Sequence, residues 1–279
     1  MPVITPALRA VWRFAGGRLR AAAEDELAGE EPLEIRVRGR AVSLTMRTPG
    51  SADDRASHDA ELALGFLLSE GIVRHADDVL AVEPCQRPAN TEGNIVNVFL
   101  SADCRFDPDQ LTRHVFASSS CGLCGRASID AIHQHFDPVY SKATVTTGTL
   151  LGLPEQLHRA QPGFKRTGGL HAAALFHSDG RLLVLREDIG RHNAVDKVLG
   201  HALRAGWLPL ADHVLMVSGR VSFEIVQKAL SAGVPVVAAV SAPSSLAVET
   251  AEASGITLVG FLRDVRFNVY CHPGRIADA

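Results

Sequence analysis

Hydrophobic and polar residues alternate with a period of two early in the chain. Leu33, Ile35 and Val37 are separated by charged residues, and a second alternating run, residues 42–46, follows Gly39. Alternation on both sides of a short turn that contains glycine is typical of a β-hairpin. The pattern therefore predicts two antiparallel strands in this region.

A helix and a further strand are expected to complete a small N-terminal unit. Ser57 is expected to cap a helix that begins at His58, has acidic residues in its first turn and ends at Gly71. A strand-like run, residues 94–100, follows. Residues 1–115 are therefore expected to form a small α/β domain with a flexible N-terminal extension.

The second half of the chain alternates short, β-branched strands with short helices. The expected strands are residues 181–185, 213–217, 234–240 and 256–262. The expected helices are residues 193–205, 223–232 and 246–254. This alternation predicts β-α-β units and a parallel sheet that is covered on both faces. Residues 116–279 are therefore expected to form a larger domain, and the fold class is α/β.

Composition and charge narrow the range of partners. The chain has 279 residues, 46% of them hydrophobic, and a formal net charge of −3, which argues against a polybasic nucleic-acid-binding protein. Its start lacks the apolar core of a secretory signal. The longest uncharged apolar stretch, residues 234–248, is interrupted by Pro235 and Pro243 and is too short to span a bilayer. Neither nucleic acid nor a membrane is expected as a partner.

Three polar loops follow strands of the second half. They are residues 186–193, 218–220 and 241–245. In an open α/β sheet ligands bind outside the carboxyl ends of strands, and the helix N-termini that follow favour anions. Arg191 and Arg220 add guanidinium groups suited to phosphate. Serine, glycine and proline are also ordinary turn residues, but three such loops together predict a ligand that carries phosphate. Neither a dinucleotide-binding nor a P-loop glycine motif is present.

Two cysteines, Cys121 and Cys124, are separated by two residues in a Ser/Gly-rich loop ahead of an expected helix at residues 128–135. A thiol close to a helix N-terminus and a basic residue ionises more readily and is a better nucleophile. A C-x-x-C pair by itself is also compatible with half a zinc site, a redox pair or no special role. The other three of the five cysteines form no second pair, so no bound metal is expected.

Two familiar chemistries of such a pair do not fit. A zinc deaminase requires H-x-E and P-C-x-x-C, but His171 is followed by alanines and Ser120 precedes Cys121. A thioredoxin-like enzyme would place the pair after an early strand, whereas here it lies in the middle of the chain. Sulfur carriage or thiol transfer is favoured instead. His171 and His192 are expected near the ligand, because neighbouring glycines let the backbone close around it.

Taken together, these segments resemble the formate dehydrogenase accessory sulfurtransferase family. The matching blocks are residues 31–35, 46–50, 64–71, 120–125, 167–173, 186–197, 218–220, 241–249 and 258–261. They occur in the family's order and extend over most of the chain. The block Glu187-Asp188-Ile189-Gly190-Arg191-His192-Asn193 is the most specific.

The resemblance implies a cytoplasmic sulfurtransferase that takes sulfur from a cysteine desulfurase. It would pass this sulfur to the molybdenum cofactor in its bis-guanine-dinucleotide form, which the formate dehydrogenase apoenzyme needs. Cys121 would carry the persulfide, and Cys124 would be its neighbour in the relay. The implied fold is a cytidine-deaminase-like α/β/α domain behind a smaller N-terminal α/β domain, in a homodimer. The alternative is a chaperone that binds the molybdenum cofactor and carries no sulfur.

The resemblance and the loops together define the expected cofactor site, which GDP should occupy as a fragment of the full cofactor. The stretch near the C-terminus that the resemblance implies is Phe261, Leu262, Arg263, Asp264, Val265 and Arg266. The loops add His171, Arg191, His192, Asn193, Ser218, Gly219, Arg220, Ser241, Ser244 and Ser245.

Overall fold

The computed structural model describes residues 7–51, 53–85, 93–104, 106, 129, 132–133, 135–263 and 265–278. The expected N-terminal hairpin is present as β3 (Glu31–Val37) and β4 (Arg40–Arg47). β6 (Ile95–Leu100) runs parallel to β3, and β5 (Val79–Pro84) pairs with β6. The result is a four-stranded sheet in the order β4-β3-β6-β5.

The helix of this unit, α1 (Arg55–Ser69), begins earlier than the sequence predicted. Its N-cap is Asp54, so the expected cap at Ser57 is wrong, and the first turn holds no acidic residue. The turn that precedes the helix accounts for the earlier start, because the Arg55 N–H already donates to the Ser51 carbonyl at 2.8 Å and the His58 N–H donates to the Asp54 carbonyl at 3.0 Å. Ser57 lies inside the helix, where its hydroxyl accepts a hydrogen bond from the Arg204 guanidinium at 3.1 Å.

The second half forms a six-stranded sheet in the order β13-β12-β11-β10-β8-β9. Its strands are β8 (His171–His177), β9 (Leu182–Asp188), β10 (His213–Val217), β11 (Val236–Ala239), β12 (Thr257–Arg263) and β13 (Arg266–Cys271). β10, β11 and β12 are parallel as expected, but β8, β9 and β13 run antiparallel to their neighbours. The expectation of a parallel sheet was therefore too simple. The connections β8–β9 and β12–β13 are short, and a short turn can join only antiparallel strands.

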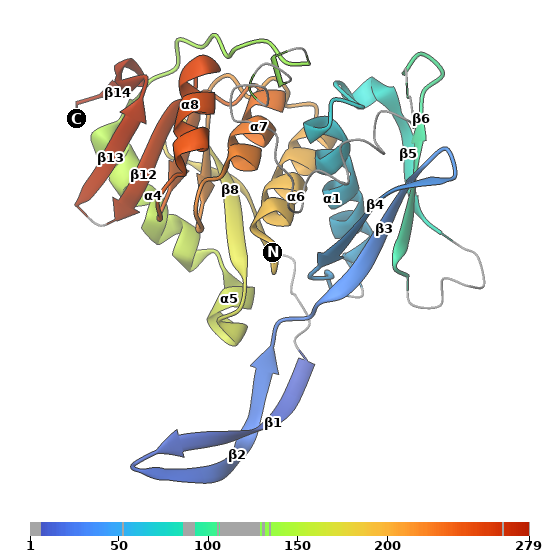
Figure 1. Ribbon diagram of the computed structural model, residues 1–279, viewed down its shortest axis with the longest axis vertical. Coiled ribbons are helices and arrows are strands. Elements are labelled where there is room, and N and C mark those ends of the chain that lie inside the picture. Colours follow the sequence, from blue (N-terminus) through green and yellow to red (C-terminus); the bar gives the residue numbers. More distant parts are fainter. Residues whose placement is uncertain are drawn as a thin grey trace.

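Helices cover both faces of this sheet (Figure 1). α6 (Arg191–Arg204), α7 (Phe223–Ser231) and α8 (Ser245–Ala253) contribute to one hydrophobic cluster, and α4 (Thr147–Arg159) contributes to the other. Alternate strand residues supply the two clusters, as the pleat requires. The remaining short elements are η1 (Ala76–Asp78), β7 (Val145–Thr146), α5 (Pro162–Thr167), η2 (Pro273–Arg275) and β14 (Ile276–Ala277).

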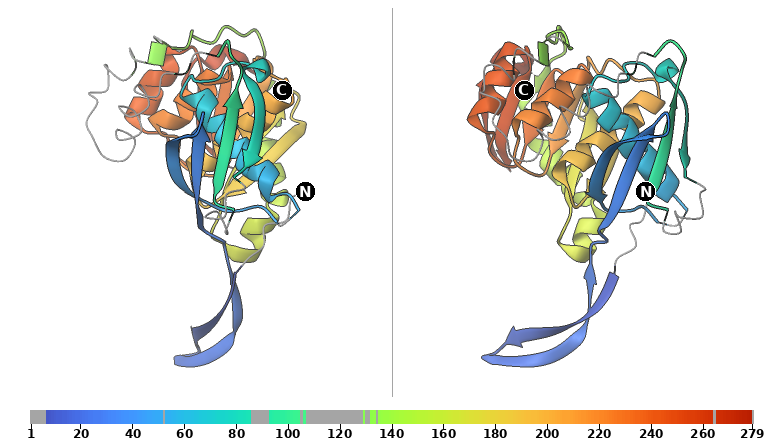
Figure 2. Two further views of the ribbon diagram at one scale, coloured as in Figure 1. Left: turned by 90° about the vertical axis from the view of Figure 1, so that its right-hand side faces the viewer. Right: turned by 45° about the vertical axis from the view of Figure 1, so that its right-hand side comes forward.

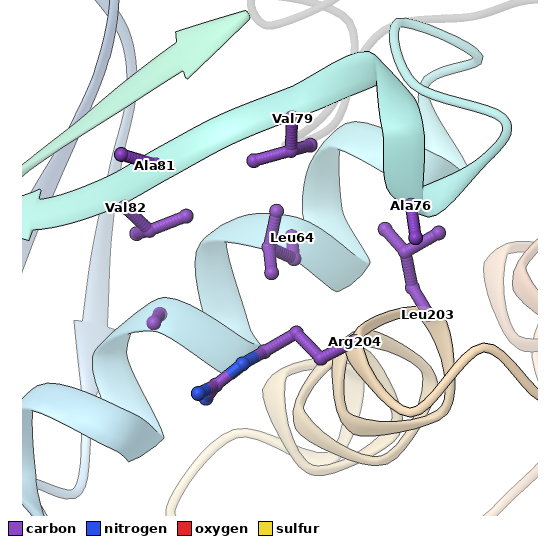
Figure 3. A pocket seen from close by; sticks show the side chains of 8 residues that line it. Leu64, Ala76, Val79, Ala81, Val82, Leu203 and Arg204 are labelled. Atoms are coloured by element: carbon purple, nitrogen blue, oxygen red, sulfur yellow. The ribbon is translucent and has the colours of Figure 1, made fainter.

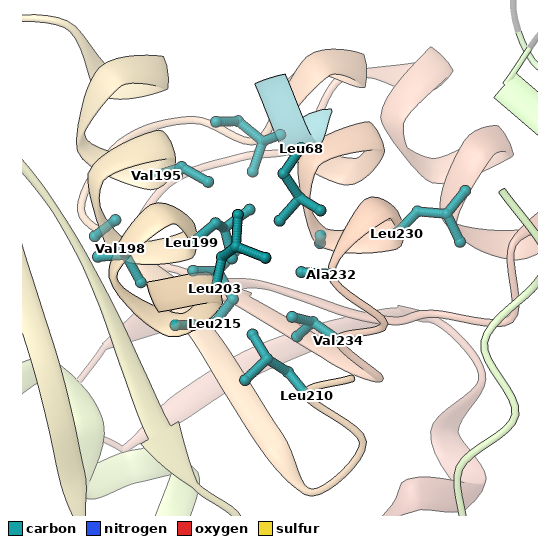
Figure 4. Packing of buried hydrophobic residues seen from close by; sticks show 14 of the residues in the cluster. Leu68, Val195, Val198, Leu199, Leu203, Leu210, Leu215, Leu230, Ala232 and Val234 are labelled. Atoms are coloured by element: carbon teal, nitrogen blue, oxygen red, sulfur yellow. The ribbon is translucent and has the colours of Figure 1, made fainter. Parts of the chain in front are cut away.

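The two expected domains share one hydrophobic core. α1 of the first half packs against α6 of the second, where Gly65 and Gly200 let the two backbones touch. A Cβ atom at Gly65 would overlap the carbonyl oxygen of Asp196, so no larger residue fits. Figure 4 shows Leu68 of α1 beside Leu199 of α6 in this core, and both belong to the larger cluster.

Residues 7–27, expected as a flexible extension, form a second hairpin of β1 (Ala7–Ala15) and β2 (Arg18–Leu27). This β1–β2 arm projects away from the rest of the protein (Figures 1 and 2). Among the described residues, its two strands pair only with each other. The alanine, arginine and glutamate residues of this segment show no clear alternation of polar and apolar positions, so the sequence did not predict the hairpin.

Candidate functional site

The three predicted loops meet at one edge of the six-stranded sheet. β8 begins at this edge and β9 ends there, since His171 pairs with Asp188. β10, β11 and β12 run in the same direction as β9 and end at the same edge. From it the chain enters the N-termini of α6, α7 and α8. The sequence-based prediction that the loops lie together is confirmed.

His171, Gly219 and Arg191 are in close proximity at this edge. A Cβ atom on Gly219 would lie 3.4 Å from His171 Nδ1 and 3.8 Å from Arg191 Cδ. Burial, together with the charges of Arg191 and Arg220, lowers the pKa of His171 and so favours the neutral imidazole. Arg191 Nε is buried and has no hydrogen-bond acceptor among the described residues. Two guanidinium groups beside a neutral imidazole are suited to an anion such as phosphate.

His192 lies next to this group but is bonded within the protein. Its Nε2 is 3.1 Å from Ser222 Oγ and 3.8 Å from Glu224 Oε2. Burial, reinforced by the charge of Arg191, lowers the pKa of His192 to about 4. His192 is therefore neutral at pH 7 and adds no positive charge to the site.

A buried ion pair holds the N-terminus of α6 in place. Lys197 Nζ lies 2.6 Å from Asp188 Oδ2, and both side chains are fully buried. The other carboxylate oxygen of Asp188 accepts hydrogen bonds from the Gly190 N–H and the Asn193 side-chain amide. Asn193 also donates to the backbone carbonyl of Met46 in β4, so its amide group is engaged in hydrogen bonds within the protein. This network fixes the position of Arg191.

Thr48 extends the same network into the N-terminal half, and sequence reasoning missed it. Its backbone N–H donates to Asp188 Oδ2 at 3.0 Å, and its carbonyl accepts from Lys197 Nζ at 2.8 Å. The Thr48 hydroxyl accepts from the Ile189 N–H. The signal available in the sequence was the resemblance block that contains Thr48, but no spacing rule links it to Asp188.

The predicted serines differ in their roles. Ser218 Oγ accepts a hydrogen bond from the Ala172 N–H at 2.9 Å and so ties β10 to β8. Ser244 caps α8 by accepting from the Ala247 N–H, and it remains exposed, as does Ser245. Ser244 and Ser245 are therefore accessible to a ligand, whereas the Ser218 hydroxyl is already bonded.

Phe261 has an unusual backbone conformation at the end of β12. Its φ is +52°, a region that residues with a side chain rarely adopt. Its N–H donates to the carbonyl of Ser241 at 3.1 Å, which ties it to the third loop, and its side chain is exposed. Residues with a strained backbone are often found at binding sites. Phe261 is therefore a candidate binding residue beside the third loop.

The other residues of the predicted C-terminal stretch are divided between core and surface. Leu262 is fully buried in the core and is not accessible to a ligand. Arg263, Val265 and Arg266 are exposed, and Arg263 Nε donates to the carbonyl of Val240. Asp264 lies outside the described residues.

Cys121 and Cys124 also lie outside the described residues, as does half of the helix expected at residues 128–135. Cys85, Cys104 and Cys271 are buried, and no disulfide joins any two of these three described cysteines. Burial raises the pKa of the Cys271 thiol to about 11 and also raises the pKa of Cys104. Because the thiolate is the nucleophile, Cys104 and Cys271 are poor candidates for sulfur chemistry.

Two cavities lie elsewhere in the protein. One, of about 270 Å³, is lined by Leu64 of α1, Val79 of β5 and Leu203 of α6 (Figure 3). The other, of about 280 Å³, follows β9 from Leu182 to Glu187.

Within the part of the chain that the structure describes, no cluster of three metal-ligating side chains occurs. No described helix has the length and apolar character needed to cross a membrane.

Comparison with known proteins gives the family. The model of the FdhD/NarQ family matches residues 28–277. The sulfur carrier protein FdhD of Mycobacterium tuberculosis is 55% identical over 90% of this chain and 92% of that protein. The protein of the same name from Streptomyces avermitilis is 49% identical over 91% of this chain and 89% of its own.

A solved structure shows the same fold. It is a protein from Desulfotalea psychrophila described as a formate dehydrogenase accessory protein, with a TM-score of 0.76 at 24% identity. The match covers 98% of this chain and all of the other. The α/β class predicted from the sequence is therefore confirmed. The family model and the relatives show that this chain belongs to the FdhD/NarQ family.

Proposed function

We propose that this protein is a sulfur carrier in formate dehydrogenase maturation. It takes sulfur as a persulfide on Cys121 from a cysteine desulfurase in the cytoplasm. It presents this sulfur to the molybdenum bis-guanine-dinucleotide cofactor destined for the formate dehydrogenase apoenzyme. The relatives' shared name, sulfur carrier protein, supports the general role.

The observation that carries the proposal is the cationic edge of the six-stranded sheet. Arg191 and Arg220 flank His171 there, and Arg191 Nε lacks an acceptor among the described residues. A guanine dinucleotide brings phosphate oxygens that accept from guanidinium groups in paired, charge-assisted hydrogen bonds. The N-termini of three helices add further donors for the same anion.

The loading step is a thiol–persulfide exchange. The Cys121 thiolate attacks the outer sulfur of the donor persulfide and forms a new S–S bond. The S–S bond of the donor breaks, and the donor cysteine leaves as a thiolate. No net oxidation occurs, and Cys121 then holds the transferred sulfur. Cys124, three positions further along the chain, is the neighbouring thiol of the relay.

Intact-mass measurement tests this step directly. The purified protein is incubated with a cysteine desulfurase and cysteine, and the mass is recorded before and after reduction. We expect a gain of one sulfur per chain that a thiol reductant removes. Peptide mapping should place it at Cys121, while the buried Cys104 and Cys271 remain unmodified and serve as internal controls.

The Cys121→Ala variant separates the carrier from a chaperone that only binds the cofactor. We expect this variant to fold, because truncating a thiol in a Ser/Gly-rich segment removes little packing. It should gain no sulfur and should fail to activate formate dehydrogenase in cells. Full activation by Cys121→Ala would contradict sulfur carriage and favour the chaperone.

A further inference from the structure

The cavity along β9, called the β9 cavity below, contains a buried polar side chain that the rest of the chain leaves unsatisfied. His58 of α1 lines this cavity and is 3% exposed. Neither of its ring nitrogens has a hydrogen-bond partner among the described residues. Buried polar groups in proteins are nearly always hydrogen-bonded, because leaving them unpaired is costly. The imidazole of His58 therefore indicates a polar ligand group inside the cavity.

The β9 cavity has room for a small organic molecule. Its volume is about 280 Å³, whereas a cavity of roughly 150 Å³ already holds benzene. Most of its lining is apolar and comes from Ala160, Pro162, Leu182, Leu183, Val184 and Leu185. A water molecule bonded to His58 would leave this apolar lining without contacts. An occupant with an apolar body therefore fits the cavity better than water does.

The charged groups of the lining are already paired within the protein. Arg186 donates to both carboxylate oxygens of Glu61, at 2.6 and 2.7 Å. His201 Nδ1 lies 2.9 Å from the same carboxylate. The Glu187 carboxylate accepts from two backbone N–H groups of α5, at 2.8 and 2.7 Å. Since no free counter-charge remains among these described lining residues, a neutral ligand is favoured over an ion.

The protonation state of His58 narrows the ligand further. Burial, with the charges of Lys197 and Arg186, lowers the pKa of His58 to about 4, so the imidazole is neutral at pH 7. A neutral imidazole has one nitrogen that donates and one that accepts. A hydroxyl group can both donate and accept, so it matches whichever nitrogen faces it.

The backbone of β9 favours a small molecule over a peptide. β9 is an edge strand, since among the described strands it pairs only with β8, and edge strands can bind extended peptides. However, the Leu185 carbonyl already accepts from the Arg186 guanidinium at 2.9 Å, and the Glu187 carbonyl accepts from Lys197 Nζ at 3.4 Å. An added strand would compete with these hydrogen bonds, whereas a molecule inside the cavity would not.

We propose that the β9 cavity binds a small neutral molecule that has a hydroxyl group and an apolar body the size of a substituted benzene ring. The hydroxyl is hydrogen-bonded to His58, and the apolar body packs against Pro162, Leu182 and Val184. Among the described residues, none of those assigned to the cofactor site lines this cavity. The inference therefore does not depend on the proposed sulfur transfer.

Two matched probes, p-cresol and toluene, test the proposal because they differ only in a hydroxyl group. Each is titrated into the full chain, and nitrogen NMR of the histidine rings follows His58, whose signal is assigned with His58→Gln. We expect p-cresol to shift the His58 signal and to bind roughly threefold to tenfold more tightly than toluene, the effect of one net hydrogen bond. No binding of p-cresol at millimolar concentration, equal affinity for the two probes, or binding that leaves the His58 signal unchanged would overturn the proposal.

The His58→Leu variant assigns the preference to the imidazole. It removes a polar group that has no partner among the described residues, so the variant should fold. It should still bind toluene but should no longer prefer p-cresol. A preference that persists in this variant would contradict the role of His58, and the NMR titration of the unaltered chain decides the question even if the variant does not fold.

His213→Leu is the matched control. His213 also has a buried ring nitrogen, Nδ1, without a hydrogen-bond partner among the described residues, but it does not line the β9 cavity. This variant should keep the full preference for p-cresol over toluene. Equal loss of the preference in His213→Leu and His58→Leu would show a general effect of removing a histidine and would refute the assignment to this cavity.

Discussion

Arg220 is an exposed cation close to His171 in the candidate site, and it has no ion-pair partner among the described residues. If phosphate binds at this edge, removing its guanidinium removes charge-assisted hydrogen bonds worth about 1.5–3 kcal/mol. We expect Arg220→Ala to bind GDP roughly tenfold to a hundredfold more weakly than the unaltered protein. Titration calorimetry with GDP measures this difference.

Arg181 provides the matched control for that measurement. It is also an exposed arginine, but it lies in the β8–β9 turn at the opposite end of the strands from His171. Arg181→Ala should bind GDP as the unaltered chain does. Equal binding by Arg220→Ala and the unaltered chain would count against the predicted phosphate site.

At the scale of an element, the position of α6 depends on the buried pair Asp188–Lys197. Replacing Lys197 by Met leaves the Asp188 carboxylate buried without its counter-ion. Breaking a buried pair from one side costs about 3–5 kcal/mol. We expect the free energy of unfolding of Lys197→Met, measured with urea, to fall by an amount in this range.

The double variant Asp188→Asn/Lys197→Met tests the cause of that loss. With both charges removed, no uncompensated charge remains buried, so part of the lost stability should return. Thr48 would still donate its N–H to the side chain at position 188. Strictly additive effects of the two substitutions would show that the pair does not act as a unit.

At the scale of the whole molecule, His58 makes stability depend on pH. It is 3% exposed, and neither ring nitrogen has a hydrogen-bond partner among the described residues. Burial, with the charges of Lys197 and Arg186, lowers the pKa of His58 from 6.5 to about 4. Between these two values the unfolded chain binds a proton that the folded chain does not, so stability falls as the pH falls.

The size of this effect follows from the interval between the pKa of His58 in the unfolded chain and its pKa in the folded chain. Lowering the pH from 7 to 5 should remove about 2 kcal/mol of the free energy of unfolding through His58. Urea unfolding at the two pH values measures the total change, and His58→Gln, which cannot titrate, isolates the contribution of His58. The variant should show the smaller pH dependence, and equal pH dependence in both proteins would refute the assignment.

Local patterns in the sequence were enough for the elements from β9 to β12 and for the gathering of the three polar loops at one edge of the sheet. The strand at 213–217 matches β10, and the expected helices at 193–205, 223–232 and 246–254 agree with α6, α7 and α8 to within two residues at either end. The spacing of hydrophobic residues and the residue types at helix ends are local properties of the sequence, so they can be interpreted without knowing the tertiary structure. The gathering of Arg191 and Arg220 at one sheet edge followed from β-α-β topology, which places loops after parallel strands together.

The tertiary structure decided what depends on contacts between distant residues. Thr48 reaches Asp188 across 140 positions, and Gly65 lies against Asp196, pairings that no spacing rule encodes. Burial separated Leu262, which is in the core, from its exposed neighbour Phe261, and the β1–β2 arm arose from a segment without a strong pattern. In each case the deciding term is a long-range contact or a solvent exposure, and both exist only once the chain has folded.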